Sequence, residues 1–255
     1  MSSHFDDLAG RHVLITGGAN GIGAAVARAF AGQGCPVTVI DRDRSAGEAV
    51  VQHCLEHGVK ARLHVVDLTD ADALCATIAD IRAHQPPVDV LIANAGYDPR
   101  FPILEMGHDE WNSLFELNVT HYFLVCRELI PNMIARRSGN VILTASHTAT
   151  LGKPDLIAYN STKAAVIGFM RGLAEAVGRF NIRVNAVAPG WTMTERQLRE
   201  HVTPEQITRT VHELQTLPVT ITADTVAQLY LFLASDAAGL LTRQVLFADA
   251  GQAKH

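Results

Sequence analysis

Three residues in one stretch of the chain have side chains that could transfer a proton. Ser146 follows an apolar run, and Tyr159 and Lys163 come after it with three residues between them. Positions i and i+4 share one face of a helix, so a helix beginning near Ala158 would point the phenol and the ammonium the same way. A phenol titrates near pKa ~10, and a neighbouring cation lowers that pKa toward neutrality. The stretch predicts a general acid/base pair beside a serine hydroxyl, although the Tyr-x-x-x-Lys spacing alone is more typical of an exposed surface pair.

Short apolar runs alternate with helix-period segments along the chain, and they would position these residues. The runs predict strands at 12–16, 36–40, 61–66, 88–93, 140–145, 182–187 and 245–248, and the segments predict helices at 21–32, 45–57, 70–84, 109–136 and 158–178. Apolar strands that alternate with helices indicate a parallel sheet covered on both faces. Right-handed crossovers then give a doubly wound, Rossmann-type α/β sheet of about seven strands. No repeat or long linker interrupts the pattern, so we expect residues 1–255 to form one domain.

The composition excludes several classes of protein. Apolar residues make up 48% of the chain and charged residues 18%, which is typical of a compact fold. A net charge of −5 gives no electrostatic reason to bind nucleic acid or an anionic membrane. No apolar run is long enough to span a membrane, and residues 1–10 lack the apolar centre of a signal peptide. The four cysteines are widely spaced, so we expect reduced thiols and a cytoplasmic protein.

No metal is expected. His53 and His57 stand four apart on one expected helix and could share a metal ion, but no third ligand follows nearby. An exposed polar helix face is the better interpretation of this pair.

The turn after the first expected strand contains glycines at Gly17, Gly21 and Gly23. Missing side chains at a strand end and a helix start let the backbone approach a pyrophosphate. The spacing is Gly-x-x-x-Gly-x-Gly rather than the more widespread Gly-x-Gly-x-x-Gly, but its position between a strand and a helix favours phosphate binding over an ordinary loop. The sequence therefore predicts a dinucleotide at this turn, with Asn20 and Ile22 taking part.

An acidic residue, Asp41, follows the second expected strand. Its carboxylate would accept hydrogen bonds from the adenosine ribose and repel the 2′-phosphate of NADP. Arg42 could bind that phosphate, so the pattern favours NAD without excluding NADP. A turn or helix-cap aspartate is the alternative for Asp41. Asp67 and Leu68, after the third strand, would meet the adenine edge, or Asp67 would only cap the next helix.

Taken in order, these motifs resemble those of the short-chain dehydrogenase/reductase family over essentially the whole chain. The matching elements are Thr16-Gly17-x-x-x-Gly21-x-Gly23, Asp67, Ala93-Asn94-Ala95-Gly96, Asn118, Ser146, Tyr159-x-x-x-Lys163, Asn185 and Pro189-Gly190. Two positions depart from the family pattern. Ala93 replaces the first asparagine of Asn-Asn-Ala-Gly, which leaves the cofactor argument intact. Ala250 replaces a glycine of Asp-Gly-Gly in a turn near the rim of the site.

The resemblance implies a catalytic tetrad and hydride transfer to or from a nicotinamide. Tyr159 would exchange the hydroxyl proton, and Lys163 would lower its pKa and bind the nicotinamide ribose. Ser146 would hold the substrate oxygen, and Asn118 would place a water that relays protons. The resemblance also implies further cofactor contacts at Asn94, Ala95, Gly96, Pro189, Gly190, Thr192 and Thr194. Because family members are commonly tetramers, it implies a homotetramer.

Substrate choice should depend on segments outside the motifs. These are residues 97–100, residues 147–154, and the polar helical stretch 191–217, which resembles the family's lid. We choose Arg100, His147 and Trp191 as candidate substrate contacts. Basic groups on the lid suit a small polar or anionic substrate, unless they are merely solvated; they are Arg196, Arg199, His201, Arg209 and His212.

We therefore expect an NAD-dependent oxidoreductase that acts on a sugar, polyol or sugar acid. It would interconvert a secondary alcohol and a ketone, or a sugar hemiacetal and its lactone. One alternative is an NADPH-dependent 3-oxoacyl thioester reductase, which Asp41 disfavours. The other is a non-catalytic NAD-binding regulatory protein, since a fold alone never proves activity. The intact tetrad and glycine turn disfavour that alternative.

Overall fold

Seven parallel strands form one sheet in the computed structural model, which describes residues 4–200 and 202–253. Their order is β3-β2-β1-β4-β5-β6-β7, so the chain reverses its direction across the sheet between β1 and β4. The strands are β1 (Val13–Thr16), β2 (Val37–Asp41), β3 (Ala61–Val65), β4 (Val90–Ala93), β5 (Gly139–Thr144), β6 (Ile182–Pro189) and β7 (Val245–Ala248). This confirms the predicted doubly wound fold.

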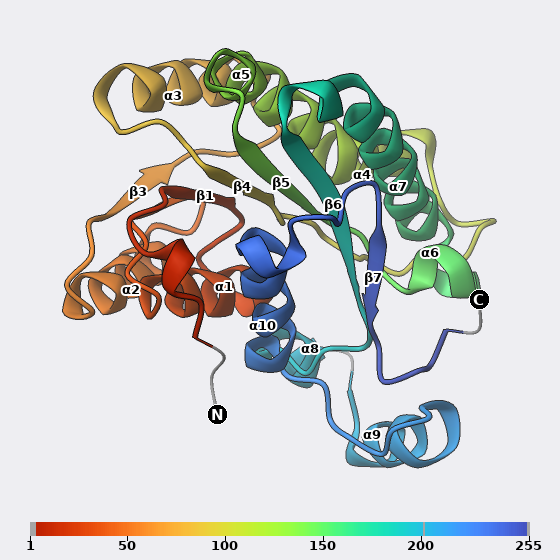
Figure 1. Ribbon diagram of the computed structural model, residues 1–255. Helices are drawn as coiled ribbons and strands as arrows, with labels where there is room; N and C mark the ends of the chain where they lie inside the picture. The colour runs from red at the N-terminus through yellow and green to blue at the C-terminus, as the bar shows by residue number, and fades with distance from the viewer. Residues whose placement is uncertain (1–3, 201, 254–255) are drawn as a thin grey trace.

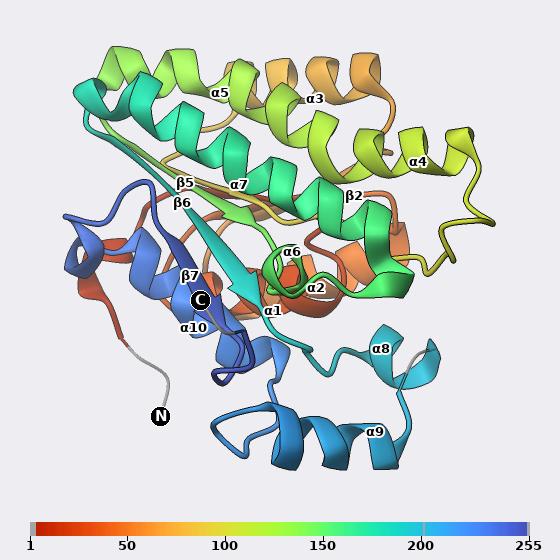
Figure 2. The same ribbon diagram turned by 90° about the vertical axis from the view of Figure 1, so that its right-hand side faces the viewer.

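Helices cover both faces of the sheet (Figure 1). One layer contains α1 (Gly21–Ala31), α2 (Arg44–Glu56) and α10 (Ala223–Ala234), and the other contains α3 (Ala71–His84), α4 (His108–Phe115), α5 (His121–Arg136) and α7 (Ile157–Val177). Three short helices follow the ends of β5 and β6: α6 (Thr148–Leu151), α8 (Glu195–Glu200) and α9 (Pro204–Arg209). Figure 2 shows α8 and α9 projecting beyond the tip of β6.

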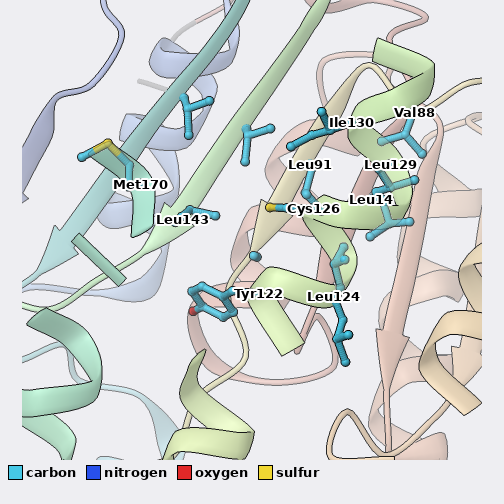
Figure 3. Close-up of a cluster of buried hydrophobic side chains, with 14 of the residues drawn as sticks. Leu14, Val88, Leu91, Tyr122, Leu124, Cys126, Leu129, Ile130, Leu143 and Met170 are labelled. Carbon is cyan, nitrogen blue, oxygen red and sulfur yellow. The ribbon is translucent and has the colours of Figure 1, made fainter. Parts of the chain in front are cut away.

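Strand side chains alternate between two apolar cores. Val13 and Ile15 point into the core shared with α1 and α10, whereas Leu14 points into the core shared with α3, α5 and α7. Figure 3 shows part of the second core, where Leu14 lies beside Leu129 of α5. Because both faces of the sheet are buried at its centre, β1 and β4 are almost entirely apolar, whereas the edge strand β3 contains Arg62 and His64.

The structure corrects one predicted helix. The segment 109–136 is not a single α-helix, because Glu116–Thr120 form a π-helical turn between α4 and α5. A π turn inserts an extra residue and rotates the following face, and such turns are frequent at functional sites. Asn118 lies in the middle of this turn and is fully buried. The other predicted elements agree with the structure to within two residues at each end.

Candidate active site

A cleft of about 650 Å³ opens at the carboxyl ends of the strands, where the strand order reverses. Open α/β sheets bind their ligands at this place. Of the residues predicted individually to take part in catalysis or to contact the cofactor or substrate, Gly23 and Asn118 do not line the cleft. Those that do are Gly17, Asn20, Gly21, Ile22, Asp41, Arg42, Asp67, Leu68, Asn94, Ala95, Gly96, Arg100, Ser146, His147, Tyr159, Lys163, Pro189, Gly190, Trp191, Thr192 and Thr194.

The glycine turn fits a dinucleotide because its backbone has no side chains that would keep a pyrophosphate away. Neighbouring segments also leave no room for such side chains. Gly17 has φ +66°, and a Cβ there would lie 2.6 Å from the Cα of Ala95. A Cβ at Gly23 would lie 2.0 Å from the carbonyl oxygen of Gly17. Helix α1 begins at Gly21, which lines the cleft. The unpaired N–H groups and the positive end of the helix dipole therefore lie where a pyrophosphate could bind.

We expect Gly23→Ala to weaken dinucleotide binding about tenfold or more. The added Cβ must displace the Gly17 carbonyl, and overpacking of this kind costs about 1–3 kcal/mol. Gly172→Ala is the matched control, because Gly172 also lies inside a helix but a Cβ there meets no atom within 4 Å. Its binding should not change and its stability should rise slightly. Titration of NAD followed by protein fluorescence measures the affinity; equal binding by both variants would contradict the prediction.

Asp41 ends β2 and fixes the glycine turn. Its Oδ2 accepts a hydrogen bond from the backbone N of Ala19 at 2.9 Å, and its Oδ1 accepts one from the N of Asp43 at 3.0 Å. The N-cap of α2 is Asp43, not Asp41. Carboxylate oxygens have further lone pairs, so these bonds leave Asp41 able to accept from a ligand. Arg42 faces Asp67, with 4.0 Å between Nη1 and Oδ2.

Asp67 is a turn residue on the wall of the cleft. Its Oδ1 accepts hydrogen bonds from the N of Thr69 at 2.9 Å and from its Oγ1 at 2.7 Å, and these bonds hold the pKa of Asp67 below its usual range. The N-cap of α3 is Asp70, so Asp67 does not cap that helix.

Tyr159 and Lys163 both lie on α7 and line the cleft, as their spacing predicts. The Nζ of Lys163 is 5.7 Å from the ring centroid of Tyr159. Lys163 is only 2% exposed, and its Nζ donates hydrogen bonds to the carbonyl oxygen of Thr144 at 2.9 Å and the hydroxyl of Tyr122 at 3.3 Å. Burial lowers the pKa of Lys163 to about 7, although the charge of Asp98 opposes this shift.

The pKa of Tyr159 differs from the sequence expectation. Burial raises it and the Asp98 carboxylate raises it further, while hydrogen bonding by Ser146 and the charge of Arg196 lower it. Lys163 does not produce the expected lowering, because its hydrogen bonds go to other groups and its own pKa near 7 leaves it only partly charged at neutral pH. Tyr159 in this structure is a protonated phenol, the form that can donate a proton to a carbonyl oxygen.

Ser146 and Asn118 have different surroundings. Ser146 lies just beyond β5, where its Oγ is 2.9 Å from the Oγ1 of Thr148. The Oδ1 of Asn118 accepts from the N of Tyr97 at 2.9 Å, and its Nδ2 donates to the carbonyl of Tyr97 at 3.0 Å and to the Oγ1 of Thr162 at 3.2 Å. Asn118 therefore ties the π turn to the segment after β4 and to α7, from behind the cleft wall.

A group of polar side chains, which we call the Asp98 clamp, joins α8 to the segment after β4. It consists of Asp98, Trp191, Arg196 and Gln197. Asp98 forms an ion pair with Arg196 and accepts a hydrogen bond from the Nε2 of Gln197 at 3.0 Å. The Oε1 of Gln197 in turn accepts from the Nε1 of Trp191 at 3.1 Å. The sequence placed Asp98 in the predicted substrate segment 97–100 but did not predict its pairing with Arg196, since residues so far apart in the chain give no local signal.

The other candidate substrate residues lie on the cleft wall. The Nη1 of Arg100 is 3.4 Å from the Oδ2 of Asp155. His147 is 3% exposed, and its backbone N donates to the carbonyl of Pro189 at 3.1 Å. Burial and the charge of Lys153 lower the pKa of His147 to about 4, so its imidazole is neutral at physiological pH.

The expected basic character of the lid is offset by acidic neighbours. Besides the Asp98–Arg196 pair, Arg199 contacts Glu200 at 2.8 Å and Arg209 contacts Glu213 at 3.3 Å. His201 lies outside the described residues. These acidic neighbours partly offset the positive charge of the segment, although the pairs of Arg199 and Arg209 are exposed and therefore weak.

Residues 4–200 and 202–253 contain no group of three or more His, Cys, Asp or Glu placed to hold a metal ion. None of the helices in this part of the chain is both long and apolar enough to cross a membrane.

The doubly wound sheet, its glycine turn and the Tyr159–Lys163 pair define a class of nicotinamide-dependent oxidoreductases. Sequence comparison agrees, because the family model described as "short chain dehydrogenase" matches residues 11–204. The chain belongs to the short-chain dehydrogenase/reductase family, whose members bind NAD(P), and it is an NAD(P)-dependent oxidoreductase.

Relatives with different substrates resemble the chain to similar degrees. "Probable galactose dehydrogenase GalD" from Rhizobium meliloti (strain 1021) is 36% identical over 251 residues, which cover 98% of each chain. A 3-oxoacyl-(acyl-carrier-protein) reductase, FabG, from Chlamydia trachomatis serovar D is 32% identical over 249 residues, which cover 96% of this chain and 98% of the relative. Sugar dehydrogenases and acyl reductases are thus both near relatives.

The solved structures that the chain resembles include examples with NAD and with NADP bound. A 3-oxoacyl-(acyl-carrier-protein) reductase from Brucella melitensis with bound NAD is 30% identical, with a TM-score of 0.87 over 98% of this chain and 94% of that one. A reductase of the same description from Agrobacterium tumefaciens C58 has NADP bound and is 28% identical. Its TM-score is 0.91, and the match covers 97% of this chain and 96% of that one.

Proposed function

We propose that this protein is an NAD-dependent dehydrogenase of a small polyhydroxylated substrate, such as a sugar, a polyol or a sugar acid. The Asp98 clamp carries the proposal. It brings carboxylate, guanidinium, amide and indole groups to the wall of the cleft that also contains Tyr159. Such groups exchange hydrogen bonds with hydroxyls, whereas a long acyl chain would favour an apolar wall. The galactose dehydrogenase relative supports the same substrate class.

The chain's own residues would manage the proton and the substrate oxygen. A bound nicotinamide would accept the hydride from the carbinol carbon, or return it in the reverse direction. Tyr159 would take the hydroxyl proton during oxidation and donate it during reduction. Ser146 would hydrogen-bond the reacting oxygen. Lys163, when protonated, would favour the phenolate of Tyr159.

The NAD preference rests on Asp41. Its carboxylate lies at the end of β2 within the cleft, where it can accept from ribose hydroxyls and would repel a 2′-phosphate. Arg42, the residue that the sequence offers for binding that phosphate, has Asp67 as an acidic neighbour, with 4.0 Å between its Nη1 and the Oδ2 of Asp67. Asp41→Ala should therefore raise kcat/KM with NADP relative to kcat/KM with NAD.

Initial rates with NAD and NADP across aldoses, polyols, sugar acids and 3-hydroxyacyl thioesters test the proposal. Reduction of NAD by a sugar, polyol or sugar acid is the expected result. Turnover only with NADP and thioesters would contradict the proposal and favour the acyl reductase alternative. Tight NAD binding without turnover of any substrate would favour a regulatory protein.

The remaining proposals concern the lid, the oligomeric state and the cellular location. Residues 191–217 would act as a lid, because α8 and α9 project beyond β6 and the Asp98 clamp ties α8 to the far side of the cleft. A homotetramer follows from the family resemblance. A cytoplasmic location is supported by the four cysteines, all of which are free thiols.

A further inference from the structure

Lys163 has a buried neighbour outside the tetrad. Tyr122 lies in the first turn of α5 and is fully buried. Its hydroxyl accepts a hydrogen bond from the Nζ of Lys163 at 3.3 Å, and its ring centroid is 5.3 Å from that nitrogen. Figure 3 shows the hydroxyl oxygen of Tyr122 pointing away from the labelled apolar side chains of the core. This phenol is therefore part of the polar surroundings of Lys163.

The Tyr122 hydroxyl also joins two strand ends. It donates toward the carbonyl oxygen of Ala95, just beyond β4, at 3.2 Å, and toward that of Thr144, the last residue of β5, at 3.1 Å. A phenol has one proton to donate and lone pairs that accept. Donation to a carbonyl thus leaves the oxygen free to accept from the Lys163 ammonium. β4 and β5 are paired neighbours, so the anchor is rigid.

We propose that Tyr122 is a positioning residue for Lys163. The Tyr122 hydroxyl holds the Lys163 ammonium against the ends of β4 and β5 and stabilises the charged form of the lysine. The proposal rests on the proposed roles of Tyr159 and Lys163 in proton transfer. Within the described part of the chain, the hydrogen-bond acceptors of Nζ are the Tyr122 hydroxyl and the Thr144 carbonyl. Removing the hydroxyl leaves the ammonium with one of these two partners.

The groups that face Lys163 come from several elements. Tyr159 lies on its own helix, Tyr122 and His121 come from α5, and Asp98 comes from the segment after β4. Burial raises the pKa of Tyr122 well above its usual value, so this phenol stays neutral. Burial and the Lys163 charge lower the pKa of His121 to about 3, so it is also neutral near pH 7. Tyr122 therefore acts on Lys163 as a hydrogen-bond acceptor and not as a counter-ion.

Tyr122→Phe removes the hydroxyl and keeps the ring, and Tyr230→Phe is its matched control. Tyr230 of α10 is equally buried and its hydroxyl is 2.7 Å from the Oγ1 of Thr144, but it lies on the opposite face of the sheet. Both variants should lose a similar amount of stability. Only Tyr122→Phe should alter the titration of Lys163.

The first measurement is an NMR titration of the free protein with isotope-labelled lysine. The chain has four lysines, Lys60, Lys153, Lys163 and Lys254, so the spectrum is simple and Lys163→Arg assigns the signal. The Lys163 midpoint, near pH 7 in the unaltered protein, should fall by about one pH unit in Tyr122→Phe. Tyr230→Phe should leave it unchanged.

The second measurement is the pH profile of kcat/KM for oxidation. Between about pH 6 and 7 a smaller fraction of Lys163 is charged in Tyr122→Phe, so kcat/KM in this range should fall relative to the unaltered protein and to Tyr230→Phe. The decrease should appear mainly in kcat rather than KM. A merely structural role would lower stability without this pH-dependent decrease.

An unchanged Lys163 midpoint in Tyr122→Phe, or an equal shift in both variants, would overturn the proposal. Failure of the proposed function is distinguishable, because the lysine titration needs neither substrate nor cofactor. If Tyr122→Phe does not fold, the unaltered protein can still test the proposal. In a pH titration its Tyr122 ring resonance should shift at the Lys163 midpoint, and a ring resonance that does not shift there would refute the positioning role.

Discussion

Tyr159→Phe should lower kcat about 10³-fold while dinucleotide affinity changes by less than about twofold. General acid/base catalysis contributes about 10²–10⁴ in rate, and the substitution removes the only atom of Tyr159 that can exchange a proton. The ring remains in the cleft wall, so the shape of the binding site is kept. Steady-state rates and a separate binding titration measure the two effects.

Tyr230→Phe again serves as the control for Tyr159→Phe. It removes a tyrosine hydroxyl that is fully buried in the other core and does not itself line the cleft, so it reports the cost of losing a hydroxyl that cannot reach the substrate. We expect its kcat to stay within about threefold, since its hydrogen bond contributes to stability by about 1 kcal/mol. Retention of a tenth or more of kcat by Tyr159→Phe would mean that another group moves the proton.

The sequence predicted the sheet because its strands are buried on both faces. Leu14 faces one core while Val13 and Ile15 face the other, so the run is apolar throughout and ends at the glycine turn. The same reasoning placed Tyr159 and Lys163 together, since their positions depend only on the regular geometry of one helix. Local periodicity was sufficient for these features.

Features that depend on tertiary contacts were not predictable. The π turn around Asn118 changes hydrogen bonding without changing residue types, so the apolar pattern of 109–136 looks like one continuous helix. The Asp98–Arg196 ion pair depends on how the segment after β4 meets α8. The raised pKa of Tyr159 depends on burial and on that same Asp98 charge, neither of which the Tyr-x-x-x-Lys spacing reveals.

Acid should destabilise the protein well before its carboxylates are protonated, because several histidines are buried as neutral rings. Burial and the charge of Lys163 lower the pKa of His121 to about 3, and burial and Lys153 lower that of His147 to about 4. Burial also lowers the pKa of His12, whose Nε2 is 2.8 Å from the Oγ1 of Thr38. An unfolded chain binds protons at these residues near pH 6.5.

The direction of the effect follows from proton linkage. Below pH 6.5 the unfolded chain binds protons that folded His121 and His147 cannot accept, so stability falls as pH falls. At pH 5 each of these two residues costs about 2 kcal/mol, which is 1.5 pH units at 1.36 kcal/mol. Their sum of about 4 kcal/mol is a large part of the 5–15 kcal/mol typical of a domain. Lys163 adds nothing to this window, because its linkage lies between pH about 7 and its usual value near 10.5.

Urea denaturation at pH 7.5 and pH 5 should therefore show a loss of about 4 kcal/mol or more. His121→Phe should reduce that loss by about 2 kcal/mol, because phenylalanine binds no proton and its ring can keep the edge-on contact with Tyr122, with 4.4 Å between the ring centroids. His212→Gln is the control, since His212 lies exposed just after α9. Equal pH dependence in His121→Phe and the unaltered protein would show that His121 accepts its proton without unfolding, and that the ring is more accessible than its burial at the start of α5 indicates.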